Sequence, residues 1–311
     1  MDTILELALN GNQRSIGRLI SLVETNSAIA KDIMKQIYPN SGLAHVIGIT
    51  GSPGSGKSTM TACLLKHFKS ENKKVGVIAV DPSSPFTGGA ILGDRLRMQE
   101  HALDSSVFIR SMGSRGSLGG VSRATSDATH ILDACGYNII IIETVGVGQS
   151  EIDIVKIADT VCLVLVPGMG DDVQIMKAGI MEIADLFVVN KSDLEGANKV
   201  ATDVQIMLNM IEKKEWIPPV LLVSSVEDTG VQEVKNKIYD HWTYIHNSAE
   251  GKNRRYSLQE MEVKGILKED ISCLVDTLFN KYKKTGYLDD ILNRKTDPYT
   301  FAEKLIKEII K

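Results

Sequence analysis

The sequence predicts an α/β fold in which a mostly parallel sheet is flanked by helices. Between residues 44 and 246, seven short apolar runs alternate with helical stretches. The runs are unbroken rather than alternating, which is typical of strands buried on both faces of a parallel sheet. The expected strands are, in order, HVIGIT (45–50), KVGVIAV (74–80), SVFIRSM (106–112), YNIIIIE (137–143), TVCLVLV (160–166), DLFVVN (185–190) and PVLLVSS (219–225).

Helical segments are expected on either side of this sheet domain. Near the N-terminus, Ile16, Leu19, Ile20 and Val23 recur at a spacing that suits one helical face. The turn sequence YPNSG follows at 38–42, and the polar stretch NSAEGKNRR precedes the last helical segment. We therefore expect an N-terminal helical extension at 1–41, a central domain at 42–246 and a C-terminal helical arm, interpreted as a dimerisation arm, at 247–311.

Composition favours a reduced, cytoplasmic protein. The chain has 311 residues, 43% of them hydrophobic, and a formal net charge of −4, which argues against general nucleic-acid binding. Its four cysteines show no CxxC spacing and are expected to be reduced thiols. No basic segment precedes an apolar stretch at the N-terminus, and no apolar run approaches the roughly 20 residues that span a bilayer. We therefore expect no nucleic-acid or membrane partner.

A glycine-rich loop follows the first expected strand and precedes a helix. Residues 51–58 fit G-x-x-x-x-G-K-[ST], whose glycines let consecutive backbone N–H groups face phosphate oxygens. In such a loop Lys57 reaches the β- and γ-phosphates and Ser58 binds Mg²⁺. The alternative, a glycine-rich turn without a ligand, is disfavoured by the complete motif in its expected setting. The predicted fold is thus a P-loop NTPase, with phosphate contacts from Gly51, Ser52, Pro53, Gly54, Ser55, Gly56, Lys57, Ser58 and Thr59.

A second motif, N-K-S-D at 190–193, follows a later strand and is typical of G proteins. Asp193 can accept hydrogen bonds from guanine N1–H and the exocyclic amine, which adenine does not offer. Asn190 can bond the purine edge and the glycine loop, and the Lys191 stem can cover the ring face. Four residues alone could be an ordinary turn, but together with the phosphate loop they favour GTP. After the next strand, Ser224, Ser225 and Val226 suit a loop that offers backbone N–H groups to guanine O6.

Acidic residues at strand ends or in switch-like loops suit magnesium, which prefers oxygen ligands. Asp81 ends the second expected strand and Glu143 ends the fourth. Gly146 lies three residues after Glu143, as in a D-x-x-G switch with glutamate in place of aspartate, and its N–H can sense the γ-phosphate. A solvated charge is the commoner role for any single acid, and Asp94 can equally cap a helix. The predicted metal ligands are Ser58, Asp81, Asp94 and Glu143, and the predicted catalytic residues are Lys57, Glu143 and Gly146.

Long motifs in this order resemble the G-protein chaperones of adenosylcobalamin-dependent acyl-CoA mutases, which include the MeaB and methylmalonic aciduria type A proteins. The resemblance covers about residues 40–245 and is carried by GITGSPGSGKST, VDPSSPFTGGAILGDRLRM, SRGSLGG, ETVGVGQSE and GIMEIADLFVVNKSD. It departs at Ser117, where histidine is expected, and at Asn138, where aspartate is usual. Ser117 leaves open which mutase is served.

The resemblance implies a GTPase that uses GTP/GDP and Mg²⁺ and gates cofactor loading into a B12-dependent mutase. The late, separate position of the C-terminal helices favours a homodimer, with a simple core role as the alternative. Asp81, Asp94 and Glu143 match the family's acidic metal positions, and residues 166–177 match a third switch that relays nucleotide state to the mutase. No glutamine is obviously placed to orient the attacking water, so slow turnover stimulated by the partner is expected. Gln149 is a candidate for orienting water, with a structural role as the alternative. Arg110, Arg115 and Arg123 are candidates for transition-state charge, with a solvated or phosphate-adjacent position as the alternative.

Three alternatives from other classes stay open at this point. A nickel-insertion GTPase shares the fold class but usually carries Cys/His clusters, and the six histidines here are isolated. A P-loop small-molecule kinase is disfavoured by the N-K-S-D motif and by Gly146. A cobalamin-binding module is disfavoured because the chain has no D-x-H-x-x-G motif.

Overall fold

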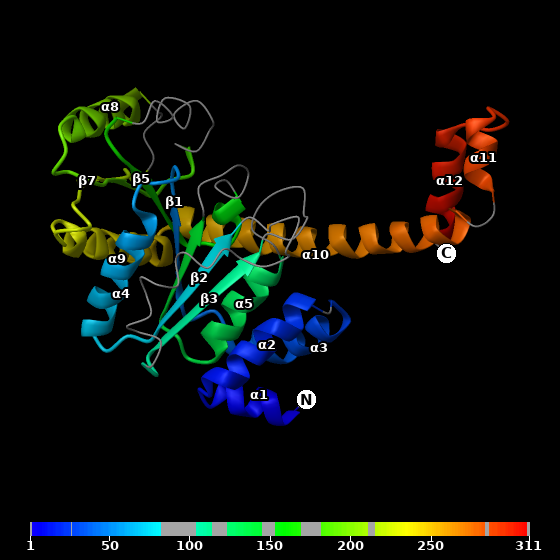
Figure 1. The fold of residues 1–311 in the computed structure, drawn as a ribbon, viewed down its shortest axis with the longest axis horizontal. Coiled ribbons are helices and arrows are strands. Elements are labelled where there is room, and N and C mark those ends of the chain that lie inside the picture. Colours follow the sequence, from blue (N-terminus) through cyan, green and yellow to red (C-terminus); the bar gives the residue numbers. More distant parts are fainter. Residues whose placement is uncertain are drawn as a thin grey trace. The chain divides into compact units, whose positions relative to one another are not determined.

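A seven-stranded sheet forms the centre of the computed structural model, which describes residues 2–25, 27–81, 104–113, 123–144, 153–168, 182–210, 215–283 and 286–309. The strand order is β3-β2-β4-β1-β5-β6-β7, and every neighbouring pair is parallel (Figure 1). The seven expected runs form these strands, so the predicted parallel α/β sheet is confirmed. Their bounds are β1 His45–Thr50, β2 Val75–Asp81, β3 Val107–Gly113, β4 Ile139–Thr144, β5 Thr160–Leu165, β6 Leu186–Val189 and β7 Val220–Leu222.

Helices cover both faces of the sheet (Figure 1). Because successive side chains of a strand point to opposite faces, β1 contributes to two cores. Ile47 and Ile49 join the core that includes residues of α4 (Lys57–Ser70) and α9 (Val231–Asn247). Val46 joins the core that includes α5 (Arg123–Ala134) and the N-terminal helices. The unbroken apolar strands noted in the sequence follow from this burial on both faces.

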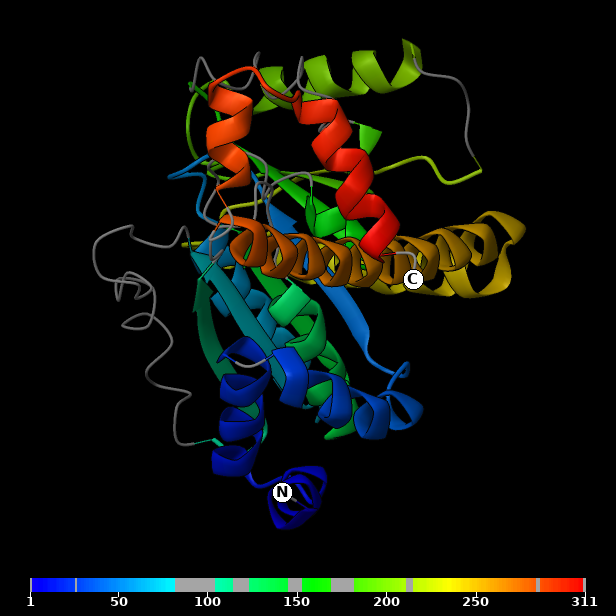
Figure 2. The same ribbon diagram turned by 90° about the vertical axis from the view of Figure 1, so that its right-hand side faces the viewer.

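The N-terminal segment folds as α1 (Asp2–Leu9), α2 (Gln13–Thr25), α3 (Ser27–Ile37) and the short 3₁₀ helix η1 (Tyr38–Asn40). Figure 2 shows α2 and α3 beside α5, and α1 packs against α2. The apolar face expected on α2 is buried against the sheet domain. Arg110 of β3 binds this segment, because its guanidinium lies 2.8 Å from the Glu24 carboxylate and donates to the Gly17 carbonyl. Arg110 therefore holds α2 on the sheet.

The chain forms two compact units, residues 1–255 and 256–311. The first unit also contains α8 (Ala197–Met210), which packs against β6 and β7. Helix α10 (Ala249–Lys283) begins in the first unit and continues into the second, which also holds α11 (Tyr287–Leu292) and α12 (Pro298–Ile309). In the second unit Phe301 is buried among the rings of Phe279, Tyr282 and Tyr287. Among the helices that the structure describes, none is long and apolar enough to cross a membrane.

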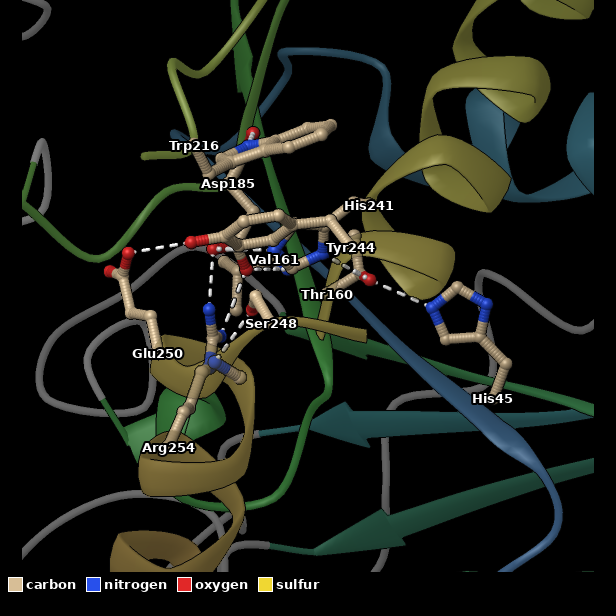
Figure 3. A network of polar contacts seen from close by, with 11 residues as sticks. His45, Thr160, Val161, Asp185, Trp216, His241, Tyr244, Ser248, Glu250 and Arg254 are labelled. Carbon is tan, nitrogen blue, oxygen red and sulfur yellow. Dashed lines mark hydrogen bonds and ion pairs between the residues drawn. The ribbon is translucent and has the colours of Figure 1, made fainter. Parts of the chain in front are cut away.

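The amino ends of β1, β5 and β6 are joined to α9 and α10 by buried polar contacts (Figure 3). We call His45, Thr160, Asp185, His241 and Arg254 the amino-edge network. Asp185, directly before β6, binds the Arg254 guanidinium through both carboxylate oxygens, at 2.5 and 2.9 Å. Its Oδ2 also accepts the Val161 backbone N–H at 2.8 Å, and its Oδ1 lies 3.3 Å from His241 Nε2. One carboxylate thus connects two strands to two helices.

Two histidines continue the amino-edge network through one hydroxyl. Thr160 Oγ1 lies 2.7 Å from His45 Nε2 and 2.8 Å from His241 Nδ1. Burial lowers the pKa of His45 well below its usual value and lowers the pKa of His241 to about 4, so both rings are neutral near pH 7. The α9–α10 junction beside them is tight, because a Cβ on Gly251 would lie 2.1 Å from the Ile245 carbonyl oxygen.

Candidate nucleotide-binding site

The predicted phosphate loop lies between β1 and the N-terminus of α4, at the carboxyl edge of the sheet. Three of its glycines have positive φ angles, +143° at Gly51, +76° at Gly54 and +90° at Gly56. Gly51 and Gly56 are also closely packed. A Cβ at Gly51 would lie 2.2 Å from the Val164 carbonyl oxygen, and one at Gly56 would lie 2.3 Å from Asn190 Nδ2. Conformation and close packing therefore both require glycine at these positions.

Several polar groups of this loop suit phosphate oxygens. The hydroxyls of Ser52 and Ser55 are buried and have no hydrogen-bond partner within the described residues. Helix α4 begins after Gly56, which has no side chain to cap the first-turn N–H groups. Lys57 Nζ is buried at the loop and donates to the carbonyls of Gly51 and Ser52, at 2.7 and 2.9 Å. Buried donors at a helix N-terminus are what an anionic phosphate requires.

Two predicted magnesium ligands meet beside the loop. Ser58 Oγ donates to Glu143 Oε1 at 2.5 Å, and the Glu143 side chain is buried at the end of β4. Glu143 pairs with Ile49 of β1 and with Ala79 of β2, which places it between the phosphate loop and the end of β2. A serine hydroxyl and a carboxylate at this distance are hard oxygen donors of the kind that Mg²⁺ prefers. These residues therefore fit the expected metal.

The other predicted switch and metal residues are described only in part. Asp81 is the last residue of β2, where its backbone pairs with Gly113, and its side chain lies outside the description. Asp94 and Gly146 lie outside the described residues, as do Gln149, Arg115 and most of the expected third switch at 166–177. Their roles stay predictions.

The predicted base-reading residues gather next to the phosphate loop. Asn190 follows β6, and its Nδ2 donates to the Ser55 carbonyl at 2.8 Å. Ser224 Oγ donates to Asp193 Oδ1 at 3.1 Å, so the loop after β7 supports the Asp193 carboxylate. Lys191 takes a left-handed conformation, with φ of 56°, that turns the chain between Asn190 and Asp193. Motifs that are more than 130 residues apart in the sequence thus form one site.

Two contacts here were not expected from the sequence. The Ser225 hydroxyl donates to Asn190 Oδ1 at 2.8 Å, whereas only backbone N–H groups were expected from this loop. The Cys63 thiol, on α4, donates to the Ser225 carbonyl at 3.1 Å. Neither contact has a local sequence signal, because each joins segments brought together only by the sheet order. Arg110, a candidate for transition-state charge, instead pairs with Glu24.

Known proteins share this combination of fold and motifs. A putative GTPase of Pyrococcus horikoshii is 47% identical over 314 residues, which cover 100% of this chain and 98% of that protein. GTPase ArgK of Escherichia coli is 36% identical, with 86% of this chain and 83% of that protein covered. The mitochondrial methylmalonic aciduria type A homolog of Caenorhabditis elegans is 33% identical, with 96% and 80% covered.

Structural similarity extends over the whole chain. The crystal structure of an LAO/AO transport system kinase has a TM-score of 0.71 and 26% sequence identity, and the match covers 100% of this chain and 97% of that one. The model of the family described as methylmalonyl-CoA mutase-associated GTPase MeaB matches residues 16–279. With phosphate and base motifs joined at one edge of a parallel sheet, and with relatives named as GTPases, this chain belongs to the MeaB family of mutase-associated GTPases.

Proposed function

We propose that this chain binds GTP with Mg²⁺ and hydrolyses it slowly, and that nucleotide state gates adenosylcobalamin loading into a B12-dependent acyl-CoA mutase. The observation that carries the nucleotide proposal is the Asn190 amide, which bridges the phosphate loop at Ser55 and the base loop at Ser225. Gly56 leaves the space that this amide occupies. The Asn190 amide thereby fixes the position of the phosphate loop relative to the base loop.

In this site each residue has a separable task. The backbone N–H groups at the start of α4 and the Lys57 ammonium bind the β- and γ-phosphates, and the Lys57 charge stabilises the transition state. Ser58 and Glu143, with Asp81 and Asp94 as further proposed ligands, hold Mg²⁺, which neutralises phosphate charge when bound. Asp193 accepts hydrogen bonds from guanine. Gly146 reports the γ-phosphate to the switch that follows β4.

Support for the mutase partner comes from the family description, methylmalonyl-CoA mutase-associated GTPase MeaB. A partner that is controlled by nucleotide must distinguish the GTP state from the GDP state, since a ligand shifts an equilibrium only through differential affinity. By the same linkage, the mutase must change nucleotide affinity in return. We assign the relay to the third switch at 166–177.

The test is the GTPase rate with and without the host's cobalamin-dependent mutases. We expect the wild type to be stimulated, and expect the triple variant Asp171→Ala/Asp172→Ala/Gln174→Ala to keep its basal rate but lose stimulation. Failure of every such mutase to change the wild-type rate would contradict the chaperone proposal. Stimulation that survives in the triple variant would contradict only the role of the third switch.

We also propose that the C-terminal arm, residues 247–311, forms a homodimer. Val263, Leu267, Ile271 and Leu274 of α10 are all at least half exposed. Their spacing of four, four and three residues places them along one stripe of the helix, as in helices that pair with a second helix. A second copy of this chain would bury this stripe. Truncation after residue 255, which keeps the first compact unit and Arg254, should give a monomer that still binds GTP, and light scattering that reports an unchanged dimer would refute this role.

A cytoplasmic location is proposed on the state of the cysteines. Cys63, Cys135, Cys162 and Cys273 are all free thiols, and the first three are buried. Free thiols are typical of a reducing compartment.

A further inference from the structure

We propose that the Ser225 hydroxyl is a positioning group for Asn190 and restricts this asparagine to donating hydrogen bonds to the base. The inference rests on the proposed GTP function and adds a residue to that site. Asn190 Oδ1 accepts two hydrogen bonds from Ser225, one from its backbone N–H at 3.1 Å and one from its hydroxyl at 2.8 Å. Both residues are buried, with 2% and 4% of their surface exposed.

The hydrogen-bonding capacity of the amide shows what this pair does. An amide oxygen has two lone pairs, and Ser225 fills both. The amide nitrogen has two N–H groups, of which one is donated to the Ser55 carbonyl. What Asn190 can still offer a ligand is therefore one N–H donor and no acceptor. That donor suits an acceptor atom on the purine edge.

The opposite amide orientation is excluded by the same neighbours. A flipped Asn190 would set its NH₂ group against the Ser225 backbone N–H and its oxygen against the Ser55 carbonyl. Two donors would then face each other, and two acceptors would face each other. The backbone N–H selects the orientation, and the hydroxyl adds the second donor that saturates Oδ1 and restrains the amide.

Ser225 is itself held by the helix that begins at the phosphate loop. The Cys63 thiol of α4 donates to the Ser225 carbonyl at 3.1 Å, and Met60 Sδ lies 4.0 Å from Ser225 Oγ. Burial raises the pKa of the Cys63 thiol, which keeps the thiol protonated as a donor. Helix α4 therefore carries Lys57 and Ser58 at its start and supports the base loop one to two turns later.

The experiment measures GTP and GDP affinity of the full chain by calorimetry. Ser225→Ala should weaken both nucleotides to the same extent, by about fivefold, which is the size of one net hydrogen bond. Ser225→Cys, which keeps a weaker donor and a similar volume, gives a second variant that should also lose affinity.

A double-mutant cycle separates positioning from general packing. In an Asn190→Ala background the hydroxyl has no amide to restrain, so Ser225→Ala should cause no further loss of affinity. Thr129→Val is the matched control, because it removes a buried hydroxyl that bonds the Thr125 carbonyl at 2.8 Å within α5. It should leave nucleotide affinity unchanged.

Each result has a defined meaning. Wild-type affinity in both Ser225 variants would overturn the inference, and so would an equal loss with and without Asn190. A wild-type protein that binds no guanine nucleotide would overturn the proposed function itself. A fivefold loss that is present with Asn190 and absent without it would establish the role of the hydroxyl.

Discussion

The two edges of the sheet differ in how their buried polar groups are bonded. At the amino edge, the Asp185 carboxylate contacts Arg254, His241 and the Val161 backbone N–H. At the carboxyl edge, the Ser52 and Ser55 hydroxyls are buried with no partner in the described part of the chain. Both edges bury polar groups, and a buried polar group costs free energy unless it is hydrogen-bonded. For Asp185, side chains of α9 and α10 meet this cost. The carboxyl edge leaves it to be met by a ligand.

The glycines of the two edges differ in the same way. Gly251 at the amino edge lets two helices of the chain approach each other closely. Gly51 and Gly56 at the carboxyl edge shape a loop whose donors suit a phosphate. We infer that the fully bonded Asp185 carboxylate supports the fold. The Ser52 and Ser55 hydroxyls, which lie in the phosphate loop and have no partner in the described residues, are available to a ligand. Substitutions at the carboxyl edge should therefore change nucleotide chemistry, and those at the amino edge should change stability.

The largest effect is expected at the carboxyl edge. Lys57→Ala should lower GTP hydrolysis by roughly 100-fold or more, because it removes the charge that stabilises the transition state at the phosphates. Thermal unfolding followed by circular dichroism should show a native fold. Lys66→Ala, an exposed lysine on the same helix, is the matched control and should keep the wild-type rate. A Lys57→Ala protein that is folded and fully active would show that this loop is not catalytic.

Asp185→Ala should have the largest effect at the amino edge. It leaves Arg254 and the Val161 N–H without their buried partner, which should lower the free energy of unfolding by about 3 kcal/mol. Urea unfolding measures this loss. Asp240→Ala, which breaks an exposed pair with Lys237, should cost less than about 1 kcal/mol. If the Asp185 variant were as stable as the Asp240 variant, the amino-edge network would not support the fold.

The pH dependence of stability tests the neutral histidines of the amino edge. Because the pKa of His241 falls from 6.5 to about 4 on folding, its contribution to stability is present above pH 6.5 and is lost as the pH falls toward 4. We expect this group to lose about 2 kcal/mol between pH 7.5 and pH 5. Asp159 acts in the opposite direction, since burial raises its pKa to about 7 and favours the folded state as the pH falls.

Comparison of variants isolates the contribution of His241 to the pH dependence of stability. His241→Gln should unfold with a shallower loss of stability between pH 7.5 and pH 5 than the wild type. Identical slopes for the His241 variant and the wild type would contradict a neutral buried His241.

The smallest effect concerns the choice of base. Asp193→Asn should weaken GTP binding by about tenfold, because the amide offers one acceptor and one donor where the carboxylate offers two acceptors. The same variant should gain affinity for xanthosine triphosphate, which presents an oxygen where guanine has its amine. Calorimetry with both nucleotides checks the exchange. Equal GTP affinity in variant and wild type would remove Asp193 from the base site.

The strands and the nucleotide motifs were predictable because their signals are local. Unbroken apolar runs identified the seven strands, and a contiguous motif identified the loop at 51–58. The amino-edge network was not predictable, because His45, Thr160 and His241 are more than 80 residues apart from one another and meet only through the order of the sheet. The same holds for the contact of Ser225 with Asn190. A single hydroxyl produces no periodic sequence pattern from which its hydrogen-bond partner could be predicted.

The central claim is that the carboxyl edge holds a guanine nucleotide, and the most direct measurement is calorimetric titration of the full chain with GTP, GDP and ATP in the presence of Mg²⁺. We expect GTP and GDP to bind at one site per chain and ATP to bind at least about 100-fold more weakly, because adenine cannot satisfy Asp193. Loss of GTP binding in the Lys57→Ala variant would place that site at the phosphate loop. Binding of ATP as tight as that of GTP, or no binding of GTP, would contradict the account.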